Sequence, residues 1–185
     1  MRAYQESTWT AARPDCPHPE WWHSTDPQST ELEVTELVAA FTRALQPEYV
    51  IETGTCVGQT AEAIGRALKA NSHGRLVTLE NEPDRAEYSR NRCEGLPVEV
   101  VVGESLEFTP TQPVDFAWLD SRTELRVPEF EHLRPWLHEG SIVGFHDTSP
   151  HQGVWGSHVE ALSRTRPIRL RTPRGVTFVE ILEGP

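Results

Sequence analysis

The chain has 185 residues, a length that suits one domain whose core needs neither disulfides nor a structural metal. Its formal net charge of -11 argues against nucleic acid and anionic membrane as partners and favours a small molecule, because the first two bind clustered cationic side chains. The three cysteines show no CxxC pairing, and no run suits a signal peptide or a membrane span, so we expect reduced thiols and a cytoplasmic protein.

The N-terminal part, residues 1–30, is rich in Pro, Trp and His and has no sustained period. This composition predicts an irregular arm, with a lid over the site and packing against the domain as its two alternative roles. Residues 31–185 are expected to form a single domain. Apolar residues at helical spacing run from Leu32 to Leu45 and stop before Pro47, which predicts an amphipathic helix.

Strands and helices alternate over the next hundred residues. Short apolar runs predict five strands, and helical periods follow the first, second and fourth of them. The strands are expected at 49–51, 76–79, 98–102, 116–119 and 142–145, and the helices around 61–68, 85–90 and 130–137. This alternation predicts an α/β fold, a Rossmann-like, doubly wound and mostly parallel sheet with helices on both faces.

The C-terminal part departs from this alternation. A helix is expected over 155–162. Two strands, at 168–171 and 176–181, flank residues 172–175 (TPRG), whose Pro and Gly are typical of a tight turn. The chain is therefore expected to end in an antiparallel hairpin.

The carboxyl ends of the predicted parallel strands are where a ligand is expected, near the topological switch point. Gly54 and Gly58 follow the first strand and allow a tight turn close to a ligand. Glu80 follows the second strand and can accept hydrogen bonds from both hydroxyls of a ribose. Thr55 and Cys56 interrupt the GxGxxG spacing of dinucleotide sites. The pattern therefore favours a nucleoside without a pyrophosphate.

With these motifs the sequence resembles the class I S-adenosylmethionine-dependent methyltransferases, and within them it is similar to the catechol O-methyltransferase and macrocin-type O-methyltransferase group. The likeness covers roughly residues 28 to 182. It rests on segments in the family's order, at 52–60 (ETGTCVGQT), 78–84 (TLENEPD), 100–105 (VVVGES), 115–121 (DFAWLDS) and 140–147 (GSIVGFHD). Their order and spacing are far more specific than any one motif.

The resemblance implies S-adenosylmethionine as the cofactor and a role for each segment. The first segment would hold the methionine part, Glu80 would bind the ribose, and Glu104 and Ser105 would lie beside the adenine. The cofactor-binding residues that it implies are Glu52, Gly54, Thr55, Gly58, Thr60, Glu80, Asn81, Glu104, Ser105 and Asp120.

Asp120, His146 and Asp147 end neighbouring strands and are expected to carry the catalysis as the ligands of a divalent metal. Oxygen ligands with one imidazole suit magnesium or manganese. Such an ion would lower the pKa of a substrate hydroxyl and aim its oxygen at the methyl group. The alternative is that Asp120 contacts only the cofactor, while His146 and Asp147 hydrogen-bond to loop backbone.

The general base is a separate question, because the family's catechol-type members carry a lysine shortly after the fourth strand. This chain has Thr123 there. Glu124, His151 and His158 are candidate replacements, and His146 is a further one if no metal binds.

The leading interpretation is an enzyme, a metal-assisted O-methyltransferase that acts on a small-molecule hydroxyl, such as a phenol or sugar in secondary metabolism. One alternative is an inactive cofactor-binding or scaffold protein of the same fold. Another is a hydroxylase-like relative that shares the pair His146 and Asp147. The short loops leave open whether a second copy of the chain, in a homo-oligomer, completes the site.

Overall fold

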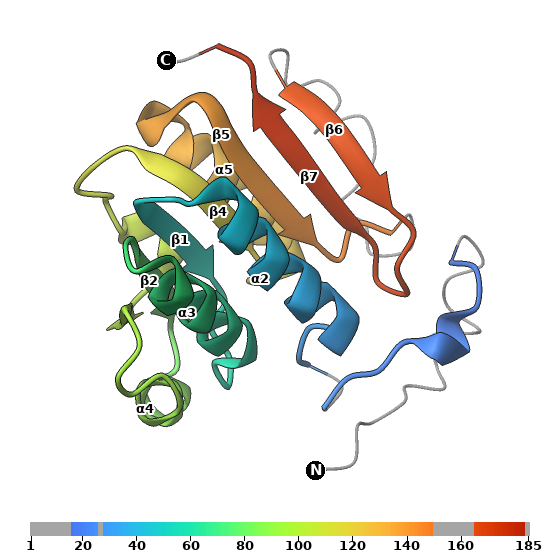
Figure 1. Ribbon diagram of the computed structural model, residues 1–185, viewed down its shortest axis with the longest axis horizontal. Coiled ribbons are helices and arrows are strands. Elements are labelled where there is room, and N and C mark those ends of the chain that lie inside the picture. Colours follow the sequence, from blue (N-terminus) through green and yellow to red (C-terminus); the bar gives the residue numbers. More distant parts are fainter. Residues whose placement is uncertain (1–15, 26–27, 150–164, 184–185) are drawn as a thin grey trace.

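The computed structural model describes residues 16–25, 28–149 and 165–183. Within them, seven strands form one sheet with helices on both of its faces (Figure 1). The strands are β1 (Tyr49–Thr53), β2 (Arg75–Glu80), β3 (Val98–Val102), β4 (Val114–Leu119), β5 (Leu137–His146), β6 (Thr165–Leu170) and β7 (Val176–Ile181). The α-helices are α2 (Leu32–Leu45), α3 (Gln59–Asn71), α4 (Pro83–Arg92) and α5 (Arg126–Leu133). None of these helices has the length and apolar character that crossing a bilayer requires.

The strand order is β3-β2-β1-β4-β5-β7-β6. Strands β1 to β5 pair in parallel, whereas β7 runs antiparallel to both β5 and β6. The order reverses between β1 and β4, so the topological switch point lies between them. The backbone N–H of Asp120, directly after β4, donates to the carbonyl of Thr53 at the end of β1, at 3.0 Å. The two loops that follow these strands therefore meet at the switch point.

The sheet is covered on both faces. Helices α2 and α3 lie in front of it in Figure 1 and pack on residues of β1, β4 and β7. Helix α5 lies behind it and packs on the other face through Phe130 and Leu133. All five residues of β1 are buried as a consequence. This explains why the central strands are continuous apolar runs in the sequence.

The structure confirms the Rossmann-like sheet, the helices on both faces and the C-terminal hairpin. The helix predicted at 130–137 has the wrong limits, because α5 ends at Leu133 and residues 134–136 form a 3-10 turn. Pro135 lies in this turn and lacks the N–H that a continuing α-helix would use. Strand β5 is ten residues long and starts earlier than the predicted 142–145. The helix expected at 155–162 lies outside the described residues.

Candidate cofactor and catalytic site

A cavity of about 360 Å³ lies at the carboxyl ends of the parallel strands. Residues from the loops after β1, β2, β3, β4 and β5 line it, together with Arg174 of the β6–β7 turn. A second, smaller cavity of about 30 Å³ shares Gln28, Gly54, Cys56 and Asp120 with the first. This is the position where an open α/β sheet binds its ligands.

Most of the predicted cofactor-binding residues line one of these two cavities. They are Gly54, Thr55, Thr60, Glu80, Asn81, Glu104, Ser105 and Asp120. Glu52 and Gly58 line neither. Glu52 is buried inside β1, and Gly58 has a φ of 73° at the start of α3, where its N–H closes a turn on the carbonyl of Thr55 at 2.8 Å. Both residues therefore support the loop after β1 without lining a cavity.

Gly54 allows the loop after β1 to pass close to the loop after β4. Its φ of 80° lies in the left-handed region, and a Cβ added there would lie 2.3 Å from the carbonyl oxygen of Asp120. Only glycine avoids both the strain and the overlap. This close approach brings the backbone of the two loops together at the cavity.

We expect Gly54→Ala to lower the free energy of unfolding by at least about 2 kcal/mol, because it adds a steric overlap to a left-handed backbone. Gly140→Ala is the matched control, since Gly140 has a φ of 87° but no atom within 4 Å of the added Cβ. Urea unfolding of both variants isolates the cost of the overlap. Equal losses in the two variants would show that the close approach contributes nothing.

The Glu80 carboxylate is fixed by the backbone around it. One oxygen accepts the N–H of Cys56 at 2.7 Å and the other accepts the N–H of Glu82 at 3.0 Å. A carboxylate has about four lone-pair positions, so two positions stay available for hydroxyl groups. Glu80 is 5% exposed and lines the larger cavity. It therefore presents a preorganised acceptor to a ligand there.

The loop after β3 forms the next part of the cavity wall. Asn81 donates through Nδ2 to the Glu104 carboxylate at 3.1 Å, which joins the loops after β2 and β3. The hydroxyl of Ser105 donates to Glu129, a buried residue of α5 that also accepts from Thr53 at 2.8 Å. Glu129 thus connects the ends of β1 and β3. Sequence reasoning missed it, because a glutamate on an amphipathic helix has the pattern of a surface residue.

The Glu52 carboxylate is buried in β1 behind the cavity. It accepts a hydrogen bond from Thr78, whose hydroxyl also pairs with that of Thr55 at 2.6 Å. Burial raises the pKa of Glu52 to about 8, against the opposing effect of the Thr78 hydrogen bond. Glu52 therefore holds a proton at neutral pH and supports the loop through Thr78.

This raised pKa makes the stability depend on pH. Between the ordinary pKa of 4.5 and about 8, the folded chain holds a proton on Glu52 that the unfolded chain has lost. The contribution of Glu52 to stability is therefore most favourable below 4.5 and falls as the pH rises toward 8, by about 1.4 kcal/mol per pH unit at most. Glu52→Gln should remove this part of the slope in urea unfolding, whereas the exposed Glu99→Gln should keep it; above pH 6.5 the raised pKa of His146 adds its own slope to every variant. Parallel pH profiles for Glu52→Gln and wild type would contradict the assignment.

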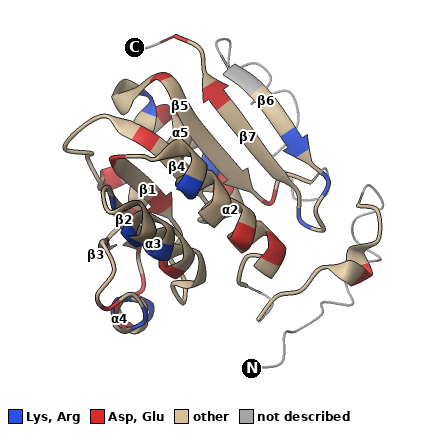
Figure 2. Ribbon diagram, in the orientation of Figure 1, with Lys and Arg blue, Asp and Glu red and all other residues tan. Residues whose placement is uncertain are grey.

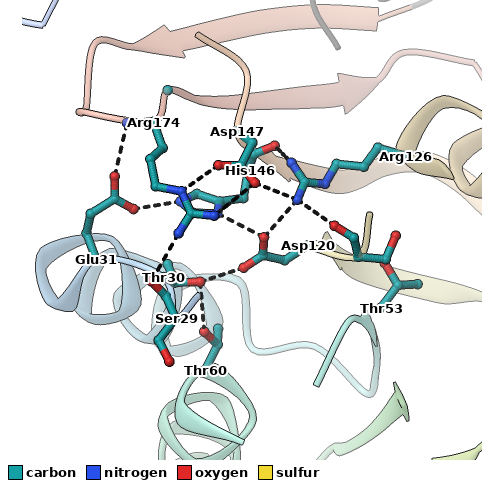
Figure 3. Close-up of polar contacts among 12 residues, drawn as sticks. Ser29, Thr30, Glu31, Thr53, Thr60, Asp120, Arg126, His146, Asp147 and Arg174 are labelled. Atoms are coloured by element: carbon teal, nitrogen blue, oxygen red, sulfur yellow. Dashed lines mark hydrogen bonds and ion pairs between the residues drawn. The ribbon is translucent and has the colours of Figure 1, made fainter. Parts of the chain in front are cut away.

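The three predicted catalytic residues come together as expected. Ligand atoms of Asp120, His146 and Asp147 all lie within 4.8 Å of one another. The ring of His146 lies between two carboxylates, with Nδ1 2.9 Å from Asp120 and Nε2 2.6 Å from Glu31 (Figure 3). Thr30 donates its hydroxyl to the other oxygen of Asp120 at 2.5 Å. The start of α2 therefore completes a cluster that the ends of β4 and β5 begin.

Two arginines enter the same cluster, and sequence reasoning missed both. The buried Arg126 donates from Nη2 to Asp120 at 3.0 Å and to Asp147 at 2.8 Å, and it also donates to the carbonyl of His146. Arg174 donates to both oxygens of Asp147, at 2.6 and 3.1 Å (Figure 3). Asp147 is thus not left to the loop backbone alone, as the alternative reading of the sequence had it.

The charges in this cluster decide the protonation of its members. Burial lowers the pKa of His146, but Asp120, Asp147 and Glu31 outweigh it and raise the pKa to about 9. Burial works the other way on Asp147, where His146, Arg126 and Arg174 hold the pKa well below its usual range. His146 is therefore protonated at neutral pH. A protonated ring has no lone pair for a substrate proton, which favours the other candidate bases.

Comparison with known proteins identifies the family of this chain. A family model described as a methyltransferase domain matches residues 51–148, from β1 to the end of β5. The chain belongs to the methyltransferase domain family. A catechol O-methyltransferase from Mycobacterium tuberculosis is 32% identical over 107 residues, which are 54% of this chain and 48% of that protein. The chain thus spans about half the length of this curated relative.

Solved structures of methyltransferases share the fold of this methyltransferase domain. The O-methyltransferase from Bacillus cereus, in complex with SAH, has a TM-score of 0.74 and 20% identity, with 84% of each chain covered. The O-methyltransferase TomG from Streptomyces achromogenes, in complex with SAM, has a TM-score of 0.71 and 22% identity, with 98% of this chain and 92% of that chain covered. At these identities the likeness shows the fold alone. It supports the class I methyltransferase fold that the sequence predicts.

The methyltransferase domain brings the predicted metal ligands together in an arrangement that does not fit a divalent ion. The carboxylates of Asp120 and Asp147 already accept bonds from Arg126 and Arg174. Both ring nitrogens of His146 face carboxylates, so neither offers a lone pair to a metal. The metal stays a prediction from the sequence, and we derive no step through it.

The candidate bases fall in different places. Glu124 lies in the 3-10 turn after β4, is largely exposed and pairs with Arg122 at 3.6 Å. Thr123, at the position of the family's lysine, begins the same turn. His151 and His158 lie outside the described residues. Arg122 lines the cavity, so Glu124, which pairs with it, stays a candidate base.

Proposed function

We propose that this chain binds S-adenosylmethionine and transfers its methyl group to a hydroxyl of a small molecule. One observation carries the proposal. The Glu80 carboxylate is held by two backbone N–H groups in the wall of a cavity at the switch point, in a chain of the methyltransferase domain family. A rigid acidic acceptor at this position suits the two hydroxyls of a ribose.

The residues around the cavity suit the other parts of the cofactor as well. The backbone at Gly54 can approach a ligand closely, and Asp120 adds negative charge where both cavities meet. A bound S-adenosylmethionine would supply an electrophilic methyl group on its positively charged sulfonium. Asn81, Glu104 and the loop after β3 would hold the base.

Methyl transfer is a displacement whose rate depends mainly on how the two reactants are positioned. The acceptor would enter beside Asp147 and Arg174, which line the larger cavity next to Asp120. Its hydroxyl must lose a proton, and Glu124, His151 and His158 stay the predicted bases. The phenol or sugar acceptor, secondary metabolism, the cytoplasmic location, the lid formed by residues 1–30 and a homo-oligomer are further predictions from the sequence.

The direct test offers the protein S-adenosylmethionine with a labelled methyl group and a panel of phenols and sugars. Mass spectrometry then measures S-adenosylhomocysteine and the methylated acceptor. We expect both products with wild type and with the exposed Glu99→Gln, and about 5- to 50-fold less of both with Glu80→Gln at a cofactor concentration near the wild-type Kd, because a 10- to 100-fold weaker affinity lowers the occupancy by that factor. Cofactor binding with no transfer to any acceptor would favour the inactive cofactor-binding protein. Turnover that requires a different cosubstrate would favour the hydroxylase-like relative.

A further inference from the structure

Two guanidinium groups lie where the sequence predicts a metal ion. Nη2 of Arg126 bridges the carboxylates, at 3.0 Å from Asp120 and 2.8 Å from Asp147. Arg174 meets the same Asp147 from the other side, through Nε at 2.6 Å and Nη2 at 3.1 Å (Figure 3). We propose that Arg126 and Arg174 replace a divalent cation in this chain, so that Arg174 supplies the fixed positive charge at the acceptor end of the cavity.

Arg174 is held in place by its backbone as well as by its side chain. Its N–H donates to the Glu31 carboxylate at 3.1 Å, and its carbonyl accepts the N–H of Ser149 at 2.9 Å. Gly175 has a φ of 80°, and a Cβ there would lie 2.2 Å from the nitrogen of Ser149. The β6–β7 turn is therefore pressed against the segment after β5. This contact makes Arg174 a built part of the site, in contrast to a freely moving surface arginine.

The start of α2 fixes the same guanidinium from a third direction. Nη1 of Arg174 donates to the carbonyl of Ser29 at 3.1 Å, and Glu31 bonds both the Arg174 backbone and His146. Figure 2 shows acidic residues in the first turns of α2 and basic residues at the end of β6 and in the following turn. Opposite charges thus join the hairpin to the helix at the edge of the cavity. The bidentate pair of Arg174 with Asp147, after β5, fixes the geometry of the guanidinium as well as its charge.

The charge of the cluster is already matched by these arginines. Asp120, Asp147 and Glu31 carry the negative charges. Arg126 pairs with both aspartates, Arg174 pairs with Asp147, and the His146 ring lies between Asp120 and Glu31. A divalent ion bound to Asp120 and Asp147 would bring two more positive charges against both guanidiniums. Like charges at such short range repel strongly in a buried site. The arginines therefore exclude the ion by position and by charge.

The consequence for catalysis rests on the proposed function. A hydroxyl that attacks a methyl group develops negative charge as its proton leaves, and a fixed cation nearby stabilises that charge. Arg174 lines the cavity, and a guanidinium has five N–H donors, of which its bonds to Asp147 and Ser29 use three. Arg174 can thus serve an acceptor oxygen without leaving Asp147.

The test is a titration with Mn²⁺ alone, followed by electron paramagnetic resonance of the free ion, on metal-stripped protein. We expect wild type, Arg174→Lys and the exposed control Arg171→Met to bind Mn²⁺ weakly and equally. Arg174→Met frees Oδ1 of Asp147, which Arg126 does not contact, and should bind one Mn²⁺ at least tenfold more tightly than wild type. Adding Asp147→Asn to Arg174→Met should abolish the gain, which places the ion in this cluster.

Two results would overturn the proposal. One is a stoichiometric Mn²⁺ bound by wild type and lost in Asp147→Asn, and the other is a folded Arg174→Met that binds no more Mn²⁺ than wild type. Circular dichroism checks the fold of each variant, and the wild-type titration decides the first point even if Arg174→Met does not fold. Because Mn²⁺ binding is read without cofactor or acceptor, failure here is distinct from failure to bind S-adenosylmethionine.

Discussion

Arg126→Met should lower the free energy of unfolding by about 3–5 kcal/mol, because removing one partner of a buried ion pair leaves the other charge uncompensated. The Arg126 side chain is 1% exposed. It bonds the carboxylates of Asp120 and Asp147 and the carbonyls of Ser121 and His146. Methionine is similar in length but donates nothing, so all four acceptors lose a partner at once.

Urea unfolding at pH 7 measures this loss. Arg66→Met is the control, because Arg66 is a largely exposed arginine that pairs with Glu62 at 2.7 Å. Exposed pairs contribute about 0–1 kcal/mol, so this variant should stay close to wild type. Adding Asp147→Asn to Arg126→Met should recover part of the stability, since it removes one of the unpaired charges. If Arg126→Met costs no more than Arg66→Met, Arg126 does not hold the cluster together.

Glu80→Gln should weaken the binding of S-adenosylmethionine by about 10- to 100-fold. The substitution keeps the shape of the side chain but removes its charge and turns one acceptor oxygen into a donor amide. Each charge-assisted bond contributes roughly 1.5–3 kcal/mol, and about 1.4 kcal/mol corresponds to tenfold in affinity. The amide would also face the backbone N–H of either Cys56 or Glu82, which the carboxylate now accepts.

Glu82→Gln is the matched control for this measurement. Glu82 is two residues away on the same loop, its side chain is 58% exposed, and it pairs with Arg85 at 3.1 Å. We expect its Kd for S-adenosylmethionine to stay within about twofold of wild type, since exposed charge pairs contribute little. Equal effects of the two substitutions would show that general charge, and not the Glu80 carboxylate, determines the affinity.

The sequence predicts the fold well, because its signals are local and repeated. The strands at 98–102 and 176–181 have the predicted limits, and the helix that starts at Leu32 ends at Leu45 as predicted. The predicted limits of α5 and β5 are wrong. Apolar residues continue through a proline turn between the two elements, and their spacing alone does not show where the helix ends and the strand begins.

The candidate site is predicted only in part. Side chains that follow parallel strands share one edge of a sheet, so the proximity of Asp120, His146 and Asp147 follows from their positions. No such rule places Arg174, which lies in a hairpin turn, or Glu31, which lies 115 residues before its partner His146. Charged residues in turns and at helix starts are usually solvated, so only the tertiary structure distinguishes these two.

A calorimetric titration of the wild-type chain with S-adenosylmethionine, with NAD as a comparison ligand, tests the identity of the cofactor. We predict one S-adenosylmethionine bound per chain and no binding of NAD, because the loop after β1 lacks the GxGxxG turn that cradles a pyrophosphate. A folded wild-type chain that gives no heat and no change in Tm with millimolar S-adenosylmethionine would contradict this prediction.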